Sequence, residues 1–572
     1  MTISEIRRRP PVEPLGMAEL HPVLRRVYAA RGVSHGEGLD LSIERLLPVS
    51  SLQSVEAAAQ LLAAHRGGRI LVVGDFDADG ATSSALMVRA LRSMKFTHVD
   101  FLVPDRFHFG YGLTPEIVAL AATRGPSLMV TVDNGVSSIE GVEAARALGI
   151  PVLVTDHHLP GKTLPRAAVI VNPNLPGSTF GSSALAGVGV AFYVMAALAR
   201  ELGDADYRPA ELLDLVALGT VADVVPLDHN NRILVAQGLR RIRAGRCVPG
   251  IRALIESAAR RLDQATASDL GFAAAPRLNA AGRLTDMSVG IACLLADDPA
   301  AAAQLAAQLA RLNEERREIE RRMQAEAVGI AAGLCVDAAG GESPGLCLFD
   351  AGWHQGVVGL VAGRIKDRLH RPVVAFARAE DGSLRGSARS VPGVNVRDAL
   401  DGIAVRNPGL IAKFGGHAMA AGMTLAEADL ERFRVEFAAE IASRADPSAL
   451  RGVVDSDGEL RGAELSIETA RVLRGAGPWG QGFPEPVFDG TFTVLEARIL
   501  AGRHLKMQLE PMPGAAAAGR GIDAIAFGHA GGDALDPSVR PGRRLQVAYR
   551  LEVNDYRGAE SMQLNCQHIL PA

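Results

Sequence analysis

The sequence contains few aromatic residues and few cysteines. Phe, Trp and Tyr make up 4% of the 572 residues, and there are only 2 tryptophans. The 5 cysteines are scattered without a C-x-x-C pair, at Cys247, Cys293, Cys335, Cys347 and Cys566. This distribution argues against a disulfide framework and against a zinc knuckle, and it favours a reducing cytoplasm.

The sequence also lacks an excess of charge of one sign. Its 60 basic and 64 acidic residues give a formal net charge of −4 at pH 7. No global positive field is therefore available to attract nucleic acid, and any such binding must depend on local basic patches. A chain of 572 residues with 48% hydrophobic content has the length of roughly three or four globular domains.

Long apolar segments are scarce as well. The N-terminal sequence MTISEIRRRPPVEP has no apolar core of the kind that a signal peptide needs. One uncharged stretch, within residues 175–199, approaches the roughly 20 apolar residues that span a bilayer. It lies between acidic and histidine motifs that we expect to meet at one site, so we interpret it as a buried helix.

A short acidic stretch, GDFDADG, is the most informative feature of the chain. The apolar run Ile70–Val73 leads into Asp75, Asp77 and Asp79, and a helical pattern follows. Three carboxylates this close repel one another unless cations compensate, and oxygen ligands suit magnesium or manganese. A solvated acidic loop and a calcium loop are the alternatives. The calcium loop fits poorly because no glutamate closes it six residues after Gly80.

The region from residue 69 to about residue 228 alternates between strand-like and helix-like patterns. The predicted strands are Ile70–Val73, Val99–Val103, Leu128–Val132, Val152–Val154 and Ala168–Val171. The segments between them, such as Pro115–Ala122 and Ile139–Leu148, have helical periodicity. This alternation predicts an α/β fold with a parallel, doubly wound sheet.

Acidic and histidine residues follow several of these segments. Asp133 follows one predicted strand, the triplet Asp156-His157-His158 follows the next, and Asp223 follows a helical segment. The carboxyl ends of parallel strands meet at one edge, so we expect these residues to lie beside the acidic stretch. A single aspartate after a strand is commonly a helix cap, but this set fits a site for two cations about 3.5–4 Å apart. The imidazole favours manganese over magnesium.

The acidic stretch, the aspartates and the Asp-His-His triplet together resemble the DHH phosphoesterase superfamily. The wider pattern resembles its RecJ family of bacterial exonucleases specific for single-stranded DNA. The resemblance implies the metal ligands Asp77, Asp79, Asp133, His157 and Asp223. It further implies that His158 contacts the scissile phosphate, that Asp75 is a ligand or orients one, and that His417 holds a phosphate close to the metals.

Other segments carry candidate DNA-binding residues. Small residues surround Arg277 in GFAAAPRLNAAGRL, as expected where a backbone closely approaches a ligand. Two Gly-rich turns, GSARS and GGH, offer backbone N–H groups and cationic side chains suited to phosphate. The resemblance implies a pocket for a 5′-phosphate end made by Arg277, Ser387 and Arg389, nucleic-acid contacts at Gly416, and a phosphate contact at Arg106.

The interval of residues 237–264 is rich in arginine but has only Glu256 and Asp263 as acidic residues. A solvated helical face and a patch that tracks phosphates both remain open interpretations.

The predicted organisation combines these segments in order. It comprises a mostly helical N-terminal segment (1–65), a DHH phosphoesterase domain (66–297), a connecting helix (298–330), a second α/β, DHH-associated nucleic-acid-binding domain (331–445) and a C-terminal OB-fold β-barrel (446–572). The predicted barrel strands are Val487–Val494, His504–Leu509, Ile522–Phe527 and Leu545–Asn554. We assign no base stacking to Trp479 or Phe483 in the linker GPWGQGFPEPVF.

Taken together, the motifs and the resemblance predict a metal-dependent 5′-to-3′ exonuclease. It would release 5′-mononucleotides from single-stranded DNA in repair and recombination, with two Mn²⁺ or Mg²⁺ ions. The alternatives are a phosphoesterase for cyclic dinucleotides, short oligoribonucleotides or polyphosphate, and a non-catalytic replication scaffold. By family analogy we expect single-strand-binding protein and a helicase as partners, and a cytoplasmic monomer without membrane contact.

Overall fold

The computed structural model describes residues 3–10, 12–13, 19–105, 109, 111–204, 206–334, 343–512, 521–529, 535–555 and 560–572. Contacts divide the chain into two compact units. Unit 1 comprises Met1–Pro11, Glu314–Arg471 and Pro486–Ala572, and unit 2 comprises Val12–Asn313 and Val472–Glu485. The division is not sequential, because the chain enters and leaves each unit more than once.

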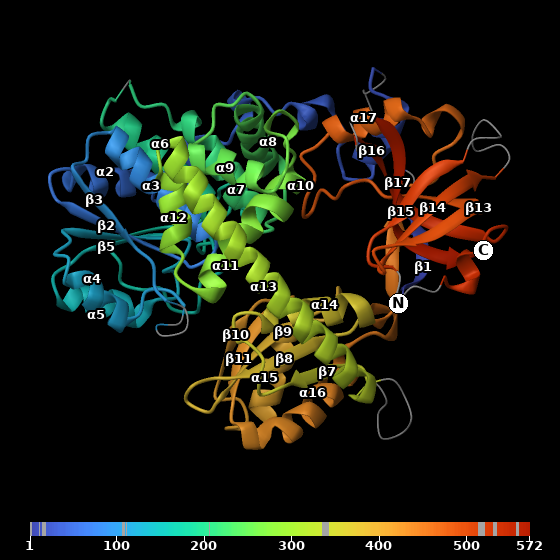
Figure 1. Ribbon diagram of the computed structural model, residues 1–572. Coiled ribbons are helices and arrows are strands. Elements are labelled where there is room, and N and C mark those ends of the chain that lie inside the picture. Colours follow the sequence, from blue (N-terminus) through green and yellow to red (C-terminus); the bar gives the residue numbers. More distant parts are fainter. Residues whose placement is uncertain are drawn as a thin grey trace. The chain divides into compact units, whose positions relative to one another are not determined.

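The core of unit 2 is a five-stranded parallel sheet (Figure 1). In spatial order its strands are β3 (His98–Leu102), β2 (Arg69–Gly74), β4 (Leu128–Val132), β5 (Val152–Thr155) and β6 (Val169–Val171). All five predicted strands are confirmed. The order reverses direction between β2 and β4, and ligands of such sheets bind outside the carboxyl ends at this switch point.

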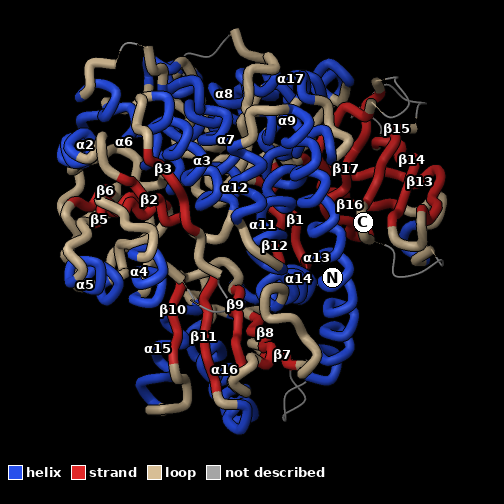
Figure 2. The backbone as a smooth tube through the Cα atoms, turned by 60° about the vertical axis from the view of Figure 1, so that its left-hand side comes forward, coloured by secondary structure: helices blue, strands red, loops and turns tan. Residues whose placement is uncertain are grey.

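Helices cover both faces of this sheet, as Figures 1 and 2 show. One face carries α4 (Pro115–Ala122) and α5 (Ile139–Ala147), and the other carries α2 (Val55–Ala64), α3 (Ala78–Ser93) and α6 (Gly187–Glu201). On the first face, Leu71 and Val73 pack in one apolar cluster with residues of α4 and α5. Burial on both faces explains why the strands read as continuous apolar runs without alternation.

The register of the sheet aligns the residues that follow three neighbouring strands. Gly74 of β2 pairs with Val132 of β4, and Val132 pairs with Thr155 of β5. The residues that come next in these strands are Asp75, Asp133 and Asp156. Three aspartates therefore follow directly after paired residues and lie side by side at the carboxyl edge of the sheet.

Mostly helical segments complete unit 2. They are α1 (Pro22–Ala29), α7 (Leu213–Ala222), α8 (His229–Arg243), α9 (Pro249–Ser257), α10 (Ala267–Asp269), a π-helical turn (Leu270–Ala274), α11 (Ala275–Leu284) and α12 (Ser288–Leu295). Helix α6 covers the second half of the uncharged stretch, and its residues from Gly187 to Met195 are all buried, which confirms the expected buried helix. Among the described residues, no helix has the length and apolar character needed to cross a bilayer.

The segment Val472–Glu485 belongs to unit 2 and packs against its N-terminal part. The rings of Trp479 and Phe483 stack with centroids 5.3 Å apart, and Tyr28 lies 5.9 Å from Trp479. The guanidinium of Arg232 lies 3.9 Å from the Phe483 ring centroid. These two aromatic side chains thus pack against other residues of unit 2.

Replacing Phe483 by alanine is expected to destabilise unit 2 by about 3–5 kcal/mol, the usual cost of truncating a buried phenylalanine. Phe483 is 4% exposed, and its ring stacks with those of Trp479 and Tyr28 and contacts the guanidinium of Arg232. Calorimetric unfolding should show a lower transition temperature for the part of the protein that binds Mn²⁺. The exposed Phe527 provides a matched control, because Phe527→Ala leaves no buried cavity. Equal stability of the two variants would contradict the packing role.

Unit 1 contains a second five-stranded sheet. Its strands in spatial order are β10 (Lys413–Gly416), β11 (Ala420–Leu425), β9 (Leu384–Arg389), β8 (Val373–Arg378) and β7 (Leu346–Phe349). Successive residues of β8 face opposite cores. Val374 and Phe376 pack with α15 (Val396–Arg406) and α16 (Leu430–Arg444), whereas Val373 and Ala375 pack with α14 (Val358–Leu369) and the end of α13 (Pro299–Leu334). Helix α13 confirms the predicted long helix.

The C-terminal part of unit 1 is a closed five-stranded barrel, preceded by α17 (Ile467–Gly475). Its strands in spatial order are β13 (Phe488–Leu500), β14 (His504–Pro511), β15 (Ile522–Ala526), β17 (Ser561–Pro571) and β16 (Arg544–Asn554). Four of these strands were predicted. The fifth, β17, was not, and it closes the barrel between β15 and β16.

The expectation of a mostly helical N-terminal segment needs a correction. Ile3–Arg8 forms a strand, β1, which pairs in parallel with β12 (Gly452–Ser456). Arg8 also forms a two-pronged ion pair with the buried Asp489, in which Nε donates to Oδ1 at 3.0 Å and Nη2 donates to Oδ2 at 2.7 Å. The sequence ISEIRR lacks the alternation of a half-buried strand, and its partner lies more than 440 residues away, so local patterns cannot reveal it.

Candidate metal centre

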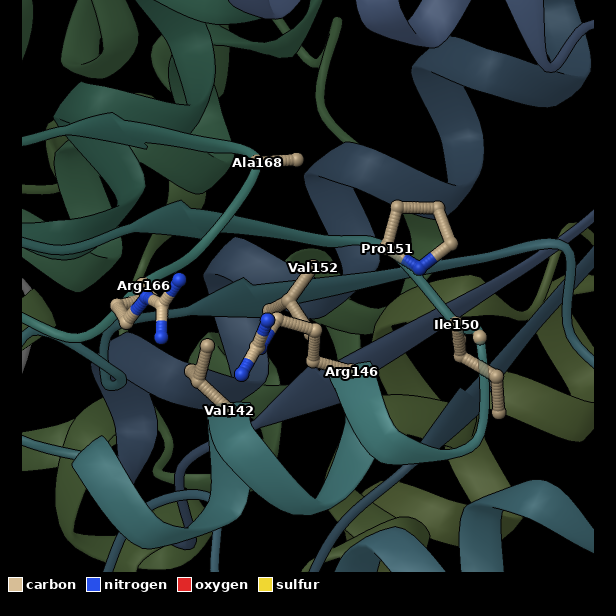
Figure 3. Close-up of a pocket in the computed structure, with 8 residues that line it drawn as sticks. Val142, Arg146, Ile150, Pro151, Val152, Arg166 and Ala168 are labelled. Carbon is tan, nitrogen blue, oxygen red and sulfur yellow. The ribbon is translucent and has the colours of Figure 1, made fainter.

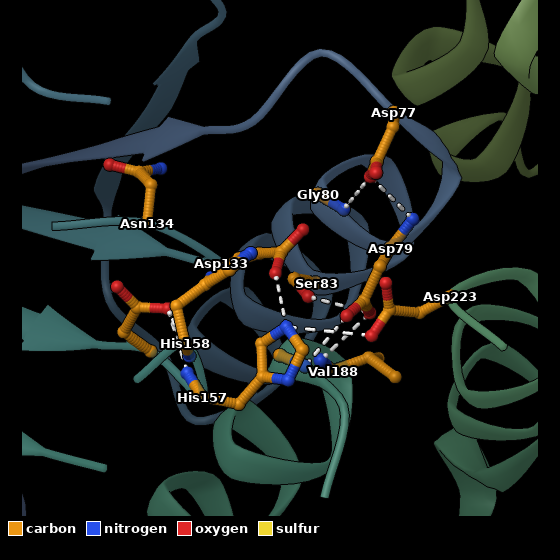
Figure 4. A network of polar contacts seen from close by, with 12 residues as sticks. Asp77, Asp79, Gly80, Ser83, Asp133, Asn134, His157, His158, Val188 and Asp223 are labelled. Carbon is orange, nitrogen blue, oxygen red and sulfur yellow. Dashed lines mark hydrogen bonds and ion pairs between the residues drawn. The ribbon is translucent and has the colours of Figure 1, made fainter. Parts of the chain in front are cut away.

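The acidic stretch forms a tight loop between β2 and the start of α3 (Figure 4). Asp77 is the N-cap of α3, and its Oδ1 accepts hydrogen bonds from the N–H groups of Asp79 at 2.9 Å and Gly80 at 3.0 Å. The N–H of Ala78, the first residue of the helix, donates to Asn279 Oδ1 at 2.9 Å. Capping thus holds one oxygen of Asp77 and fixes the direction of its carboxylate.

Asp79 lies in the first turn of α3 and is buried. Its two carboxylate oxygens accept hydrogen bonds from the N–H groups of Gly187 at 2.6 Å and Val188 at 2.9 Å, at the start of α6. Burial, followed by the charge of Asp77, raises the pKa of Asp79 to about 7, although these hydrogen bonds act in the opposite direction. A helix N-terminus therefore stabilises the carboxylate only in part.

Asp133, His157 and Asp223 converge from three different elements (Figure 4). His157 Nε2 lies 3.1 Å from Asp133 Oδ1 and 3.4 Å from Asp223 Oδ2. Among the described residues, these two carboxylate oxygens are buried and accept no hydrogen bond. Burial, and next the charge of Asp79, raises the pKa of both carboxyls well above the usual value.

The side chains of this edge form three overlapping groups with the spacing of cation ligands. In each group, one donor atom from every residue lies within 4.8 Å of the others. The groups are Asp133–His157–His158, Asp79–His157–Asp223 and Asp75–Asp77–Asp133. Buried, mutually repelling carboxylates with imidazole nitrogen nearby are the donor set that Mn²⁺ or Mg²⁺ stabilises, and two ions fit the shared members.

His158 is held beside the cluster by Asp156. Its Nδ1 lies 2.8 Å from Asp156 Oδ1, which also accepts the N–H of His157 at 2.7 Å and of His158 at 3.1 Å. Burial alone would lower the pKa of His158, but the hydrogen bond and charge of Asp156 raise it to about 9. The Tyr111 hydroxyl lies 3.2 Å from the His158 ring nitrogens. With this pKa, His158 is a cation at neutral pH, and Asp156 and Tyr111 fix the orientation of its ring.

Sequence reasoning assigned no role to three residues that organise this loop. Asp156 orients His158, as described above. Asn172, which follows β6, donates to the carbonyl of His158 at 2.9 Å, and Asn174 donates to that of His157 at 2.6 Å. The position of the two asparagines after the carboxyl end of a strand was the available signal, since the other site residues occupy equivalent positions.

The small residues of α11 have a different explanation from the one expected. A Cβ on Gly282 would lie 1.8 Å from the carbonyl oxygen of Phe76. The backbone of α11 thus approaches the protein's own acidic loop, and Asn279 on the same helix bonds to Ala78. Close packing against the Asp75–Asp79 loop thus explains the glycine at position 282, and the approach of a ligand to the rest of the segment stays a prediction.

These pKa shifts predict that cation binding strengthens as the pH rises. Raised carboxyl pKa values mean that the folded, metal-free protein holds more protons than the unfolded chain. The stability of the metal-free protein therefore falls as the pH rises. For Asp79 this fall extends from pH 3.8, the ordinary pKa of the group, to about pH 7, its pKa in the folded protein. Since cations displace these protons, the increase in melting temperature caused by Mn²⁺ should grow over this range. Melting curves with and without Mn²⁺ at pH 5 to 8 test this, and a constant increment would contradict it.

The candidate phosphate-binding residues lie in both units. In unit 1, Arg389 Nη1 donates to Ser387 Oγ at 2.9 Å, so these two lie together on β9. Gly416 has φ 142° and ends β10, and His417 follows it in the hairpin to β11. In unit 2, Arg277 Nη1 donates to the carbonyl of Ala273 at 2.7 Å.

One predicted contact and one predicted patch complete this set. Arg106 lies outside the described residues. In the arginine-rich interval, Arg243 and Arg252 donate to backbone carbonyls, and Arg261 pairs with Asp263. Arg240 donates to the carbonyl of Leu41 and Arg260 pairs with Asp269, so contacts within the protein occupy at least five of these arginines.

A cavity of about 320 Å³ lies at the opposite edge of the same sheet (Figure 3). Its lining comes from the amino ends of β5 and β6 and from α5: Val142, Arg146, Gly149, Ile150, Pro151, Val152, Arg166 and Ala168. It contains none of the clustered carboxylates. Glu143 pairs with Arg146 there at 2.7 Å.

Comparisons with known proteins agree with these features. The family model described as DHH family, N-terminal domain matches residues 69–220, the DHHA1 domain matches 342–443, and the RecJ OB domain matches 456–568. The single-stranded-DNA-specific exonuclease RecJ of Escherichia coli (strain K12) is 52% identical over 99% of both chains. That of Dickeya dadantii (strain 3937) is 53% identical over 100% of this chain and 99% of its own.

A solved structure is similar over the same length. The crystal structure of RecJ in complex with Mn²⁺ from Thermus thermophilus aligns with a TM-score of 0.80 and 32% identity. The alignment covers 99% of this chain and 80% of that one. Identity of this extent over almost the whole chain, with all three domain models in order, leads to one conclusion: the chain belongs to the RecJ family of the DHH phosphoesterases.

Proposed function

We propose that this protein is a metal-dependent exonuclease that removes 5′-mononucleotides from single-stranded DNA in the 5′-to-3′ direction. The observation that carries the proposal is the register of β2, β4 and β5, which brings Asp75, Asp133 and the Asp156-His157-His158 triplet to one edge. Membership of a family whose relatives are named single-stranded-DNA-specific exonucleases supports the substrate. We further propose a role in DNA repair and recombination.

The proposed cation ligands are Asp77, Asp79, Asp133, His157 and Asp223, with Asp75 as a ligand or an orienting residue. The ions would be Mn²⁺ or Mg²⁺, consistent with the donor set and with the Mn²⁺- and Mg²⁺-bound RecJ structures. When bound, two such cations neutralise phosphodiester charge and make water a stronger nucleophile.

The remaining site residues hold the substrate in this proposal. His158, kept protonated by Asp156, donates to an oxygen of the scissile phosphate and stabilises its developing charge. Ser387, Arg389 and Arg277 bind the 5′-phosphate end, and a cationic fork next to a hydroxyl suits that group. Gly416 and His417 hold a phosphate near the cations, and Arg106 contacts another.

The proposed organisation keeps the predicted boundaries: an N-terminal segment to residue 65, a DHH domain at 66–297, a connecting helix at 298–330, a DHH-associated domain at 331–445 and an OB-fold at 446–572. The barrel would bind the strand beyond the site. Single-strand-binding protein and a helicase as partners, a monomeric state and a cytoplasmic location are further proposals.

Digestion of end-labelled strands tests the proposal. With Mn²⁺, a 5′-labelled single strand should release a labelled mononucleotide in the first turnovers, whereas a 3′-labelled strand should shorten progressively. A blunt duplex should remain intact. Label released first from the 3′ end would overturn the polarity, and faster cleavage of a cyclic dinucleotide than of the strand would favour the alternative phosphoesterase. Absence of both Mn²⁺ binding and hydrolysis would favour a non-catalytic scaffold.

The full chain is the appropriate material for this test. A truncation at residue 451 would also remove Val472–Glu485, which packs within unit 2. Loss of activity in such a fragment would mix destabilisation of unit 2 with loss of DNA binding by the barrel.

A further inference from the structure

Phe272 is the most exposed large hydrophobic side chain among the described residues, with 76% of its surface accessible. Its neighbours Leu270, Ala273 and Ala274 are buried. Packing within the chain therefore fixes this segment but not the ring. Single exposed apolar residues are common on protein surfaces, so exposure alone assigns no role.

The backbone at Phe272 is unusual. Leu270–Ala274 forms a π-helical turn in which the N–H of Ala275 bonds to the carbonyl of Leu270. Such turns are rare and occur frequently at functional sites, because the additional residue shifts side chains out of the regular helical positions.

The turn lies against the elements that carry the candidate ligands. A Cβ on Gly271 would lie 3.2 Å from Val221 Cγ1, and Val221 precedes Asp223 by two residues. Helix α11, which continues the turn, contacts the acidic loop through Asn279 and Gly282. The segment that carries Phe272 therefore packs against α7 at Val221, near Asp223, and continues into a helix that packs against the Asp75–Asp79 loop.

A cation is fixed on the same segment. Arg277 donates to the carbonyls of Ala273 at 2.7 Å and Ser257 at 3.3 Å, which holds its guanidinium close to the turn. A second exposed apolar side chain, Val224, follows Asp223 with φ 60° and 63% exposure. An accessible aromatic ring on the same segment as a cation is a combination that binds single strands, since the cation attracts the backbone and the ring stacks on a base.

We propose that Phe272 stacks against one nucleobase of the single strand and positions it next to the metal-binding edge. This inference rests on the function proposed above and identifies a substrate-positioning residue for it. Every base offers a π-face, so the contact is sequence-tolerant, as stepwise removal of successive nucleotides requires. A base paired in a duplex has its faces covered by its neighbours, so the contact also favours single strands over duplexes.

The test combines substitutions of Phe272 in the full chain with an abasic site in the DNA. The substrates are 5′-phosphorylated single strands in which one tetrahydrofuran abasic residue is moved stepwise from the 5′ end. Steady-state hydrolysis with Mn²⁺ gives kcat and KM for the wild type, Phe272→Ala and Phe272→Trp. The control Leu148→Ala removes an exposed apolar side chain that follows α5, at the amino edge of the sheet.

Loss of the stacking contact is expected to raise KM by about 10- to 100-fold in Phe272→Ala, whereas Phe272→Trp and Leu148→Ala stay close to the wild type. For the wild type, an abasic residue at one position should cause a similar loss. At that position Phe272→Ala should lose nothing more, because the base and the ring form a single interaction.

Other outcomes overturn the inference without affecting the proposed function. If the wild type digests single strands but Phe272→Ala has the same KM, the ring contacts no base. If Phe272→Ala instead melts at a lower temperature and loses activity equally at every abasic position, the ring has a packing role. Failure of the wild type to hydrolyse any strand would reject the proposed function itself.

Discussion

Replacing Asp133 by asparagine is expected to lower turnover by more than about 100-fold. Loss of a residue that only orients a metal ligand lowers activity by at most about 100-fold, so a larger loss indicates a direct ligand. Asp133 leaves β4 at the switch point of the sheet and faces both His157 and the acidic loop. It belongs to two of the three groups with ligand spacing. The amide keeps the shape of the side chain but removes the negative charge that a cation needs.

The same variant should stay folded. In the metal-free protein, burial and then the charges of Asp79, Asp77 and Asp223 raise the pKa of Asp133. Removing one of several repelling carboxylates should leave the melting temperature unchanged or increase it, while the increase caused by Mn²⁺ should shrink or disappear. A side chain important only for folding would give the opposite pattern.

Asp100→Asn is the matched control for this measurement. Asp100 lies on β3 of the same sheet but pairs with Arg124 on the surface, at 3.1 Å. Its replacement should change stability by less than about 0.5 kcal/mol and leave Mn²⁺ binding intact. Substantial turnover by Asp133→Asn, measured as mononucleotide release from labelled single strands, would reject Asp133 as a ligand.

Replacing Asp156 by asparagine is expected to lower kcat by about 10²- to 10⁴-fold, the range seen when a catalytic imidazole loses its function or its orienting carboxylate. Asp156 Oδ1 accepts from His158 Nδ1 and from the N–H groups of His157 and His158, and Oδ2 accepts from the N–H of Val136. An amide has only one accepting oxygen, so at least one of these donors loses its partner.

The pH profile distinguishes this positioning role from a general structural one. In the wild type, Asp156 keeps His158 protonated up to a pKa of about 9. Without that charge the pKa falls toward its usual value of 6.5, so the alkaline decline of kcat should begin at lower pH. Mn²⁺ affinity, measured by calorimetric titration, should change much less than kcat, since the cation ligands remain. An unchanged alkaline limb would contradict the role of Asp156.

The site could be predicted to the level of residue types at strand ends. Apolar runs followed by Asp75, Asp133 and the Asp156 triplet were visible because short-range periodicity encodes parallel strands, and such strands share a carboxyl edge. A fold with Asp77, Asp133, His157 and Asp223 in separate regions would have refuted the hypothesis. The structure places them within ligand distance in overlapping groups.

Features that depend on contacts between distant segments were missed. β1 pairs with β12 across more than 440 residues, and β17 closes the barrel by pairing with both β15 and β16. The contact of Gly282 with Phe76 of the acidic loop was not predicted either. In each case the partner, not the local pattern, determines the role of the segment.

The sequence by itself thus determined the five strands of the parallel sheet, four of the five barrel strands, the chemistry of the donor atoms and the family. Only the tertiary structure decided the register in which Gly74 pairs with Val132 and Val132 with Thr155. It also decided the hydrogen bond between Asp156 and His158, and the packing of Trp479 and Phe483 inside unit 2. The physical reason is that periodicity and residue type are local properties, whereas register and close approach are set by simultaneous packing of segments far apart in the chain.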